Sequence, residues 1–373
     1  MDNWVTFSDI LAVPIRNGLT KPKAIRGTGV KMIAMGEIFA HARISDIAMD
    51  RVPVTDKELT NCGIEEGDLL FARQSLVLEG AGKCSIVTEV SEATVFESHL
   101  IRTRIDTNKA DPYFVFYYFN SPHGRDNIKT IVEQVAAAGI RGSDLIKLSI
   151  PCPPVDEQKR ISRILRAIDE KIENNEKIND NLQQQAQAIY TAMFISNADP
   201  AWVQGRLSDL ITIKYGKDHK KLADGMYPVF GSGGIMRYVE RPLYTGESVL
   251  IPRKGTLNNV IYVNEPFWSV DTMFFTEMKM PNIAKFVFHF VKAKDLASMN
   301  AGSAVPSMTT DILNAIELTI PSAEHLAEFE AVVAPMYQAM QANNRESAKL
   351  AELRDALLPK LISGEVDVSS IQI

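Results

Sequence analysis

The amino-acid sequence predicts an α+β fold in which two globular, strand-rich domains are separated by two long helices that form an antiparallel coiled coil. Three observations support this prediction. Two segments carry sustained heptad patterns of apolar residues. Each of these segments follows a globular block. The sequence LSIP precedes the first segment, and the closely similar LTIP precedes the second. The chain therefore reads as a tandem repeat of one unit, a globular block followed by a long helix.

The first helical segment covers residues 153–199. It contains no Gly or Pro beyond Pro154, and Asp156 is suited to cap its start. Roughly 38 helical residues at 1.5 Å each span about 57 Å, which is too long for one ordinary globular domain. The segment therefore predicts a spacer. Asn175 and Asn179 occupy the middle of its seam, where polar residues fix the register at some cost in stability.

The second helical segment covers residues 322–364. A shift of 168 residues, which takes Ile161 to Phe329, superposes the two apolar seams. Two such helices in one chain most simply pair antiparallel. Pro335 lies inside the second pattern, so we expect a kink or a break near Ala334. The apolar residues expected to pair the helices are Ile161, Leu165, Ile168, Ile172, Leu182, Ile189, Met193, Phe329, Val333, Met336, Met340, Leu350, Leu357 and Leu361.

Composition and charge limit the class of protein. The chain has 373 residues, enough for two or three domains, and a formal net charge of −6 argues against a protein that simply coats nucleic acid. Cys62, Cys84 and Cys152 have no C-x-x-C spacing, which argues against a disulfide scaffold or a structural zinc site. No signal-peptide pattern and no long apolar run occur. We therefore expect a soluble, cytoplasmic protein without a membrane partner.

The first block, residues 1–152, combines short apolar runs with turn residues. The runs that predict strands are WVTFSDIL, VKMIAMGEIF, GDLLFAR, KCSIVTEV and VFESHLIRTRI. DPYFVFYYFNSP (111–122) predicts a short amphipathic helix that ends near Pro122, and HGRDNIKTIVEQ is a second candidate helix. The block is therefore expected to be an α+β domain rich in strands.

A loop in the first block, residues 72–84, carries residue types that suit contacts with DNA. Arg and Gln can make bidentate contacts with guanine and adenine edges. An ordinary solvated loop would carry the same residue types. The candidate DNA-binding residues here are Arg73, Gln74, Ser75 and Lys83.

The second block, residues 200–321, opens with a lysine cluster suited to phosphate contacts, although a solvated turn explains it equally well. Gly231, Gly233 and Gly234 match no nucleotide-binding spacing, so they indicate a tight turn. A later strand–loop–strand segment parallels the loop of the first block, with Gly67 matching Gly246 and Arg73 matching Arg253. The candidate DNA-binding residues of this block are Lys217, Lys220, Lys221, Arg253, Lys254, Asn258 and Asn259.

Catalytic motifs are not found in the sequence. DPYF (111–114) is the nearest match to the motif of an amino-group methyltransferase, but it lacks the second proline and no cofactor loop precedes it. Walker A, H-E-x-x-H and G-x-S-x-G patterns do not occur, and the histidines lack metal-ligand spacing. We therefore expect no catalysis, no bound cofactor and no metal in this chain. Two such blocks separated by a rigid spacer favour a recognition device.

Taken together, these segments resemble the specificity (S) subunit of Type I restriction–modification systems. The segment IPCPPVDEQKRISRILRAIDEKI (150–172) resembles the conserved region that follows the first target-recognition domain of that family. LAELRDALLPKLISGEVDV (350–368) resembles the second conserved region, and YPVFGSGGI and VLIPRKGT resemble common phrases of its recognition domains. The resemblance covers essentially the whole chain.

The resemblance implies target-recognition domains at 1–152 and 200–321, spacer helices at 153–199 and 322–364, and a tail at 365–373. Each domain would read one half of a bipartite site in double-stranded DNA. The helices would set the spacing and dock two methyltransferase subunits, which methylate adenine. Those partners would use S-adenosylmethionine, and restriction subunits, if present, would use ATP with Mg²⁺. This chain would contribute recognition alone.

Two alternatives remain open from the sequence. A coiled-coil adaptor that binds other proteins through both blocks would share the same architecture. A specificity subunit of a modification-only phage-defence system would share the same sequence features, because the nuclease is another polypeptide.

Overall fold

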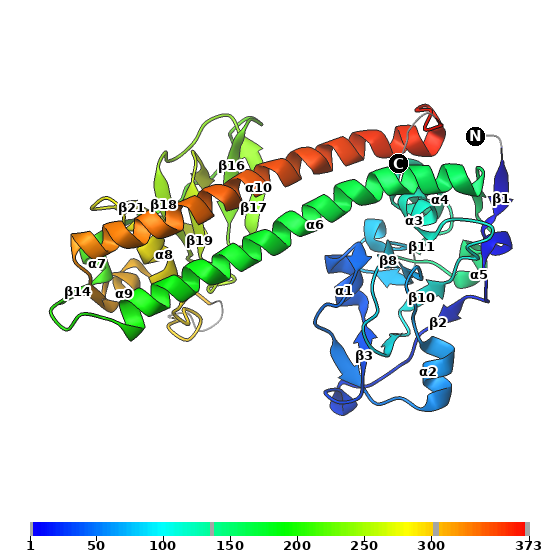
Figure 1. Cartoon of the computed structure of the whole chain (residues 1–373), viewed down its shortest axis with the longest axis horizontal. Coiled ribbons are helices and arrows are strands. Elements are labelled where there is room, and N and C mark those ends of the chain that lie inside the picture. Colours follow the sequence, from blue (N-terminus) through cyan, green and yellow to red (C-terminus); the bar gives the residue numbers. More distant parts are fainter. Residues whose placement is uncertain (1–2, 135–137, 301–305, 370–373) are drawn as a thin grey trace. The chain divides into compact units, whose positions relative to one another are not determined.

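The computed structural model describes residues 3–134, 138–300 and 306–369. The chain divides into two compact units. The colours of Figure 1 follow the sequence, so the segments that form each unit can be identified there. Unit 1 comprises Met1–Asn174 and Glu346–Ile373, and unit 2 comprises Asn175–Arg345. Each unit therefore contains one globular domain together with part of each long helix. Of the predicted tail, residues 370–373 lie outside the described part.

The two long helices are α6 (Val155–Thr191) and α10 (Ala323–Ser363). A π-helical turn, Ala192–Ser196, extends α6. The predicted helices are therefore present, with ends within a few residues of the expected ones. Asp156 lies inside the first turn rather than at the cap, because the carbonyl of Pro154 already accepts the N–H groups of Glu157 and Gln158.

Within each unit the two helices run antiparallel. In unit 1, Asp169 pairs with Arg354 at 2.8 Å, and Lys171 pairs with Glu346 at 3.1 Å, so the numbering rises on α6 as it falls on α10. In unit 2 the amide of Asn179 donates to the side chain of Asn344 at 2.8 Å, and Asn343 donates back to Asn179 at 2.9 Å. The predicted antiparallel pairing is confirmed within each unit.

We expected a kink or a break near Ala334. The break is not present, because α10 continues through Pro335, and the kink stays a prediction. A proline inside a helix leaves the carbonyl four residues earlier without its partner. Pro335 and Ala331 are both exposed, so water can reach that carbonyl. The buried neighbours Val333 and Tyr337 hold the helix against the core of unit 2.

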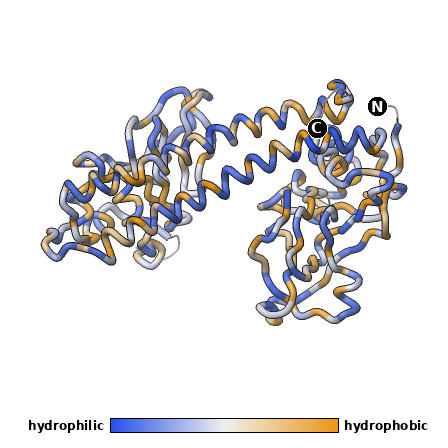
Figure 2. Tube along the Cα trace, viewed as in Figure 1, coloured by the Kyte–Doolittle hydropathy of each residue, from blue (hydrophilic) through white to orange (hydrophobic). Residues whose placement is uncertain are grey.

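The residues expected to pair the helices are all buried or half-buried, and Figure 2 shows hydrophobic and hydrophilic residues alternating along both helices. Several of them also complete a domain core. Ile161, Leu165 and Leu361 share one apolar cluster with Phe71 and Phe119 of the first domain. The seam is therefore shared between helix pairing and domain packing.

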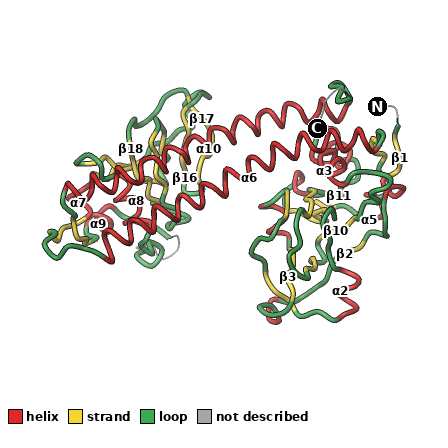
Figure 3. The backbone as a smooth tube through the Cα atoms, viewed as in Figure 1, coloured by secondary structure: helices red, strands yellow, loops and turns green. Residues whose placement is uncertain are grey.

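Unit 1 combines short strands and short helices, as the strand and helix colours of Figure 3 show. Its helices are α1 (Met35–Ala40), α2 (Asp56–Cys62), α3 (Pro112–Asn120), α4 (Pro122–Lys129) and α5 (Gly142–Leu145). Its strands are β1 (Trp4–Thr6), β2 (Arg16–Asn17), β3 (Val30–Ile33), β4 (Arg43–Ile44), β5 (Asp50–Val52), β6 (Leu69–Ala72), β7 (Gln74–Ser75), β8 (Cys84–Val87), β9 (Thr94–Phe96), β10 (Leu100–Thr103), β11 (Glu133–Gln134), β12 (Ala138–Gly139) and β13 (Ser149–Pro151). The main sheet has the order β2-β10-β6-β8-β4, and smaller sheets have the orders β5-β3-β9, β11-β12-β7 and β1-β13.

Three sequence predictions for the first domain are corrected. The run WVTFSDIL is a strand only to Thr6, and a 3₁₀ turn, Phe7–Ile10, follows. VKMIAMGEIF changes from strand to helix after Ile33, where the Glu37 carboxylate accepts the backbone N–H of Ala34 at 2.8 Å. The expected helix α3 exists, but its residues 113–119 are all buried, so it is not amphipathic.

Unit 2 repeats this architecture. Its short helices are α7 (Leu207–Leu210), α8 (Ala284–Lys292) and α9 (Thr310–Asn314). Its strands are β14 (Val203–Arg206), β15 (Ile211–Tyr215), β16 (Tyr227–Gly231), β17 (Gly234–Val239), β18 (Glu247–Pro252), β19 (Ile261–Asn264), β20 (Trp268–Ser269), β21 (Met273–Met278) and β22 (Glu317–Ile320). The sheet orders are β15-β21-β18-β19, β17-β16-β20 and β14-β22. Residues 232–233 connect β16 to β17, so the predicted tight turn is confirmed.

The first strand of each domain pairs antiparallel with the strand that precedes the long helix. In unit 1, β1 pairs with β13, and in unit 2, β14 pairs with β22. The phrases LSIP and LTIP therefore mark equivalent strands. Each pair closes the domain where the chain passes into α6 or α10, so the tandem repeat predicted from the sequence is present in the structure.

Candidate nucleic-acid interface

Arg73 and Arg253 occupy equivalent positions in the two domains. Arg73 follows β6, and its N–H donates to the carbonyl of His99, the residue before β10, at 2.8 Å. Arg253 follows β18, and its N–H donates to the carbonyl of Thr272, the residue before β21, also at 2.8 Å. The carbonyls of both arginines accept a further backbone hydrogen bond at 2.9 Å, from Ile140 and Met308 respectively.

The glycines matched in the sequence precede the equivalent strands. Gly67 has φ of +86° before β6, and Gly246 has φ of +134° before β18. Both values lie where glycine avoids the steric cost of a side chain. The two strand–loop segments are therefore copies of one motif, and each presents an arginine at the end of its strand.

In the first domain, the loop exposes two of the four candidate residues. Arg73 and Gln74 are exposed, and within the described part of the chain the side chain of neither has a polar partner. Ser75 is buried, and its hydroxyl accepts the N–H of Val77 at 3.1 Å. Lys83 is half-buried, donates to the carbonyl of Phe39 at 2.9 Å, and its pKa is lowered by burial.

Two of these candidates already have partners within the protein. Ser75 stabilises the turn through its hydroxyl, which accepts the N–H of Val77. Lys83 lies over the Phe39 ring at 5.5 Å. Contact of all four residues with DNA stays a prediction, and Arg73 and Gln74 are the two whose side chains are exposed.

The second-domain loop places Arg253 against an exposed aromatic ring. Its guanidinium carbon lies 5.3 Å from the centre of the Tyr215 ring, and its Nη1 donates to the carbonyl of Asp271 at 3.2 Å. Tyr215 is 52% exposed and packs edge-on against Phe274 at 5.1 Å. A guanidinium held this way is oriented while its remaining donors stay available. Tyr215 was missed in the sequence, although it directly precedes the lysine cluster.

The lysine cluster follows β15. Lys217, Lys220 and Lys221 are exposed, and within the described residues their ammonium groups form no ion pair. The backbone N–H of Lys217 donates to the carbonyl of Ser269 at 2.8 Å, which anchors the start of the loop. Lys214, on β15 itself, pairs with Glu277 at 3.4 Å. The cluster therefore offers three exposed lysines, although Asp218 lies among them and accepts the backbone N–H of Lys220 at 3.1 Å.

The remaining second-domain candidates divide into two groups. Lys254 is exposed, and its ammonium group has no ion pair among the described residues. Asn258 bonds to Asp295 at 3.1 Å and accepts the N–H of Ala297 at 3.0 Å. Asn259 donates to the carbonyl of Ser232 at 2.8 Å. Both asparagines hold loops together through these hydrogen bonds, and their contact with DNA stays a prediction.

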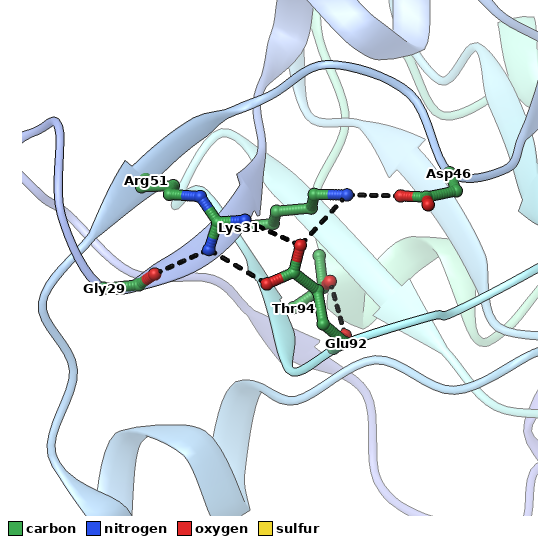
Figure 4. A network of polar contacts seen from close by, with 6 residues as sticks. All are labelled: Gly29, Lys31, Asp46, Arg51, Glu92 and Thr94. Carbon is green, nitrogen blue, oxygen red and sulfur yellow. Dashed lines mark hydrogen bonds and ion pairs between the residues drawn. The ribbon is translucent and has the colours of Figure 1, made fainter.

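Two other cations of the first domain, Arg51 and Lys31, are paired with carboxylates, as Figure 4 shows. Arg51 binds both oxygens of Glu92, the shorter bond being 2.7 Å, and donates to the carbonyl of Gly29. Lys31 pairs with Asp46 and with Glu92, and hydrogen bonds to these carboxylates raise its pKa. These two cations bridge strands of one small sheet and are poor candidates for phosphate contacts.

In the described part of the chain, no three His, Cys, Asp or Glu side chains gather as metal ligands would. Nor does any described helix have the length and apolar character needed to cross a membrane. The geometry thus defines a tandem protein whose two copies of one domain each present an arginine-bearing loop.

Comparison with known proteins specifies the family. Residues 3–184 and 201–328 match the family described as the Type I restriction modification DNA specificity domain. The chain belongs to this family, and it is a specificity subunit of a Type I restriction–modification system.

Relatives named as specificity subunits span most of the chain. It is 20% identical to the MjaIX specificity subunit of Methanocaldococcus jannaschii, over 85% of this chain and 82% of that protein. It is 22% identical to the EcoprrI specificity subunit of Escherichia coli, over 88% and 86% respectively. The crystal structure of the S subunit from M. genitalium shares the fold, with a TM-score of 0.61, 18% identity and 96% coverage of both chains.

Proposed function

We propose that each globular domain reads one half of a bipartite DNA site, and that the paired helices set the spacing between the halves. The observation that carries this proposal is the duplication of one loop, in which Arg73 and Arg253 each donate one backbone hydrogen bond and accept another at equivalent positions. Two equivalent readers in one chain suit a site that is read in two separate parts.

The side chains of these loops suit the two kinds of DNA contact. Arg73, Gln74 and Arg253 carry donors that match base edges in the major groove. Lys217, Lys220 and Lys221 supply positive charge for phosphates, which fixes position without reading sequence. Base contacts and phosphate contacts thus come from adjacent loops of the second domain.

Methylation is assigned to partner subunits. We expect two methyltransferase subunits to dock on the paired helices, bind S-adenosylmethionine and methylate one adenine in each half-site. Restriction subunits, where present, would supply translocation and cleavage with ATP and Mg²⁺. This chain would act in the cytoplasm, as a recognition subunit that carries out none of these reactions.

Partner docking is expected on the outward face of the helices. On α6, some residues of this face contact the first domain and others are exposed to solvent. Arg163 is exposed and available. Arg166 lies over the Tyr113 ring at 3.9 Å and pairs with Glu170 at 3.4 Å. Glu170 also lies 3.7 Å from Arg43 of the first domain. Arg166 and Glu170 therefore hold the first domain to its helix, and Arg163 is the better candidate for a partner contact.

The net charge of −6 predicts that this chain alone binds DNA weakly. The methyltransferase subunits are expected to supply much of the positive surface. Filter binding with and without these subunits measures the difference, and tight, sequence-specific binding by the isolated chain would contradict the prediction.

A methylation map tests the function. The chain is expressed with its neighbouring methyltransferase subunit, and modified adenines in the host DNA are sequenced. A split motif, with two short defined halves around a fixed gap, is the expected result. A one-piece motif would mean that one domain alone reads DNA. Assembly without any modification would favour an adaptor role.

A further inference from the structure

An exposed apolar tip follows the arginine-bearing loop of the first domain. It consists of Leu76, Val77 and Leu78, whose exposed fractions are 98%, 59% and 40%. Phe39 is 40% exposed, and its ring lies beside Gly80 at the base of the tip. Contiguous exposed apolar side chains are unfavourable in water and typically mark an interaction site.

Hydrogen bonds hold the backbone of the tip at Val77 and the backbone of the segment that follows the tip. The guanidinium of Arg125 donates to the carbonyls of Glu79, Ala81 and Gly82, at 2.7, 3.2 and 2.9 Å. The Ser75 hydroxyl accepts the N–H of Val77 at 3.1 Å. Leu76 therefore lies between hydrogen-bonded neighbours, with its side chain in solvent.

The charges around the tip favour DNA as its partner. Exposed Arg73 and Gln74 lie three and two residues before Leu76, and Lys83 follows in the same loop. Glu79 is the single acidic residue in 72–84. Proteins that kink DNA insert aliphatic side chains between base pairs while nearby polar and basic residues hold the groove and backbone.

We propose that Leu76 is a wedge that enters a base step of the half-site read by the first domain. The proposal rests on the DNA-reading function proposed above. Arg73 and Gln74 would recognise base edges, and the wedge would in addition favour DNA sequences that unstack easily. Pyrimidine–purine steps unstack most easily. The half-site of the first domain is therefore expected to contain such a step.

The test uses the complete methyltransferase complex on duplexes that carry its mapped motif. 2-Aminopurine replaces one base at a time outside the target adenines and their neighbours, because its fluorescence rises on unstacking. The variants are Leu76→Ser, which removes the apolar wedge, and Leu76→Met, which keeps it. Ile25→Ser, at a residue that is 44% exposed elsewhere in the same unit, controls for loss of surface apolarity.

Wild type, Leu76→Met and Ile25→Ser are expected to raise the fluorescence at one step, and Leu76→Ser to abolish that rise and weaken binding roughly tenfold. Two results would overturn the proposal: a fluorescence rise that persists in Leu76→Ser, or no rise with wild type bound to its motif. Failure of Leu76→Ser to assemble with the methyltransferase in the absence of DNA would assign the tip to protein docking instead. If the wild-type complex shows no specific DNA binding at all, the proposed function itself fails, and the wedge fails with it.

Discussion

The hydroxyl of Tyr337 on α10 lies 2.9 Å from Nε2 of His289 on α8, and Nδ1 of the same ring lies 2.8 Å from the Gln187 side-chain oxygen on α6. A neutral imidazole that donates from Nδ1 to the amide oxygen and accepts the Tyr337 hydroxyl satisfies all three groups. His289 therefore ties the buried helix of the second domain to both long helices of unit 2.

Unit 1 has a counterpart at the equivalent place. Tyr117 on α3 donates to Asp169 on α6 at 2.6 Å, and Arg354 on α10 pairs with Asp169 at 2.8 Å. The shift that superposes the helices takes Asp169 to Tyr337. Each unit therefore joins three helices through one buried polar group, although the residue types differ.

The first prediction concerns pH and unit 2. Burial lowers the pKa of His289 from 6.5 to about 4, and the charge of Lys292 acts in the same direction. Between these values the unfolded chain binds a proton that the folded unit does not. Stability is therefore complete above pH 6.5 and decreases as the pH falls toward 4, by at most about 3 kcal/mol.

Denaturant unfolding followed by tryptophan fluorescence checks this pH dependence. Trp202 and Trp268 report on unit 2, and a Trp4→Phe background removes the signal of unit 1. His289→Gln is expected to flatten the slope between pH 4 and 6.5. His219→Gln, at a half-buried position of the same unit, is the control. An unchanged slope in His289→Gln would contradict the assignment.

The second prediction concerns Asp169. Asp169→Asn removes the charge that Arg354 pairs with, so we expect a loss of about 1.5–3 kcal/mol in the local stability of unit 1. Asp355→Asn is the matched control, because Asp355 also pairs with Arg354 but is 66% exposed, and surface pairs contribute about 0.2–1 kcal/mol. Hydrogen exchange of the α3 amides measures both. Equal effects of the two variants would show that burial of the pair is unimportant.

The third prediction concerns the asparagines between the helices. Asn179→Leu or Asn343→Leu alone leaves the other amide without its partner, at a cost of about 1 kcal/mol or more. The double variant is expected to cost less than the sum of the single variants, because both polar groups are removed together. Thermal unfolding of unit 2 measures this cycle, with exposed Gln184→Leu as the control. Strict additivity would mean that the two amides do not interact.

The fourth prediction concerns base reading by Arg253. Arg253→Ala is expected to weaken binding of the complex to its motif by about 1–3 kcal/mol and to relax one position of that motif. Arg241→Ala changes an exposed arginine of the same domain and should leave the motif intact. Methylation mapping of both variants provides the comparison. An unchanged motif and affinity in Arg253→Ala would remove this residue from the interface.

The fifth prediction concerns phosphate contacts. Replacing Lys220 and Lys221 together by Ala should weaken binding of the complex to all DNA sequences alike. It should also lower the slope of log affinity against log salt by about 2, because each phosphate contact contributes about 0.9. Lys214→Ala, at a lysine that already pairs with Glu277, should change the slope little. A shift of the recognised motif in the double variant would instead indicate base contacts.

The sequence alone determined the two long helices and the tandem repeat. A heptad pattern is a local property, since residues three and four apart share one helix face, so the seam from Ile161 to Met193 predicted α6 without tertiary information. The same holds for the match of Arg73 with Arg253, because the flanking glycines and strands repeat along the chain. The helix break expected at Pro335 is not found, because packing of Val333 and Tyr337 outweighs the local helix-breaking preference of proline.

Only the tertiary structure decided which polar side chains are free. Ser75 and Arg73 are both polar residues of one segment, but the side chain of Ser75 is buried and that of Arg73 is exposed. Lys83 is held by the carbonyl of Phe39, and Asn259 by that of Ser232, both remote in sequence. Whether a side chain meets solvent or a carbonyl depends on segments brought together by folding, and no local pattern contains that information.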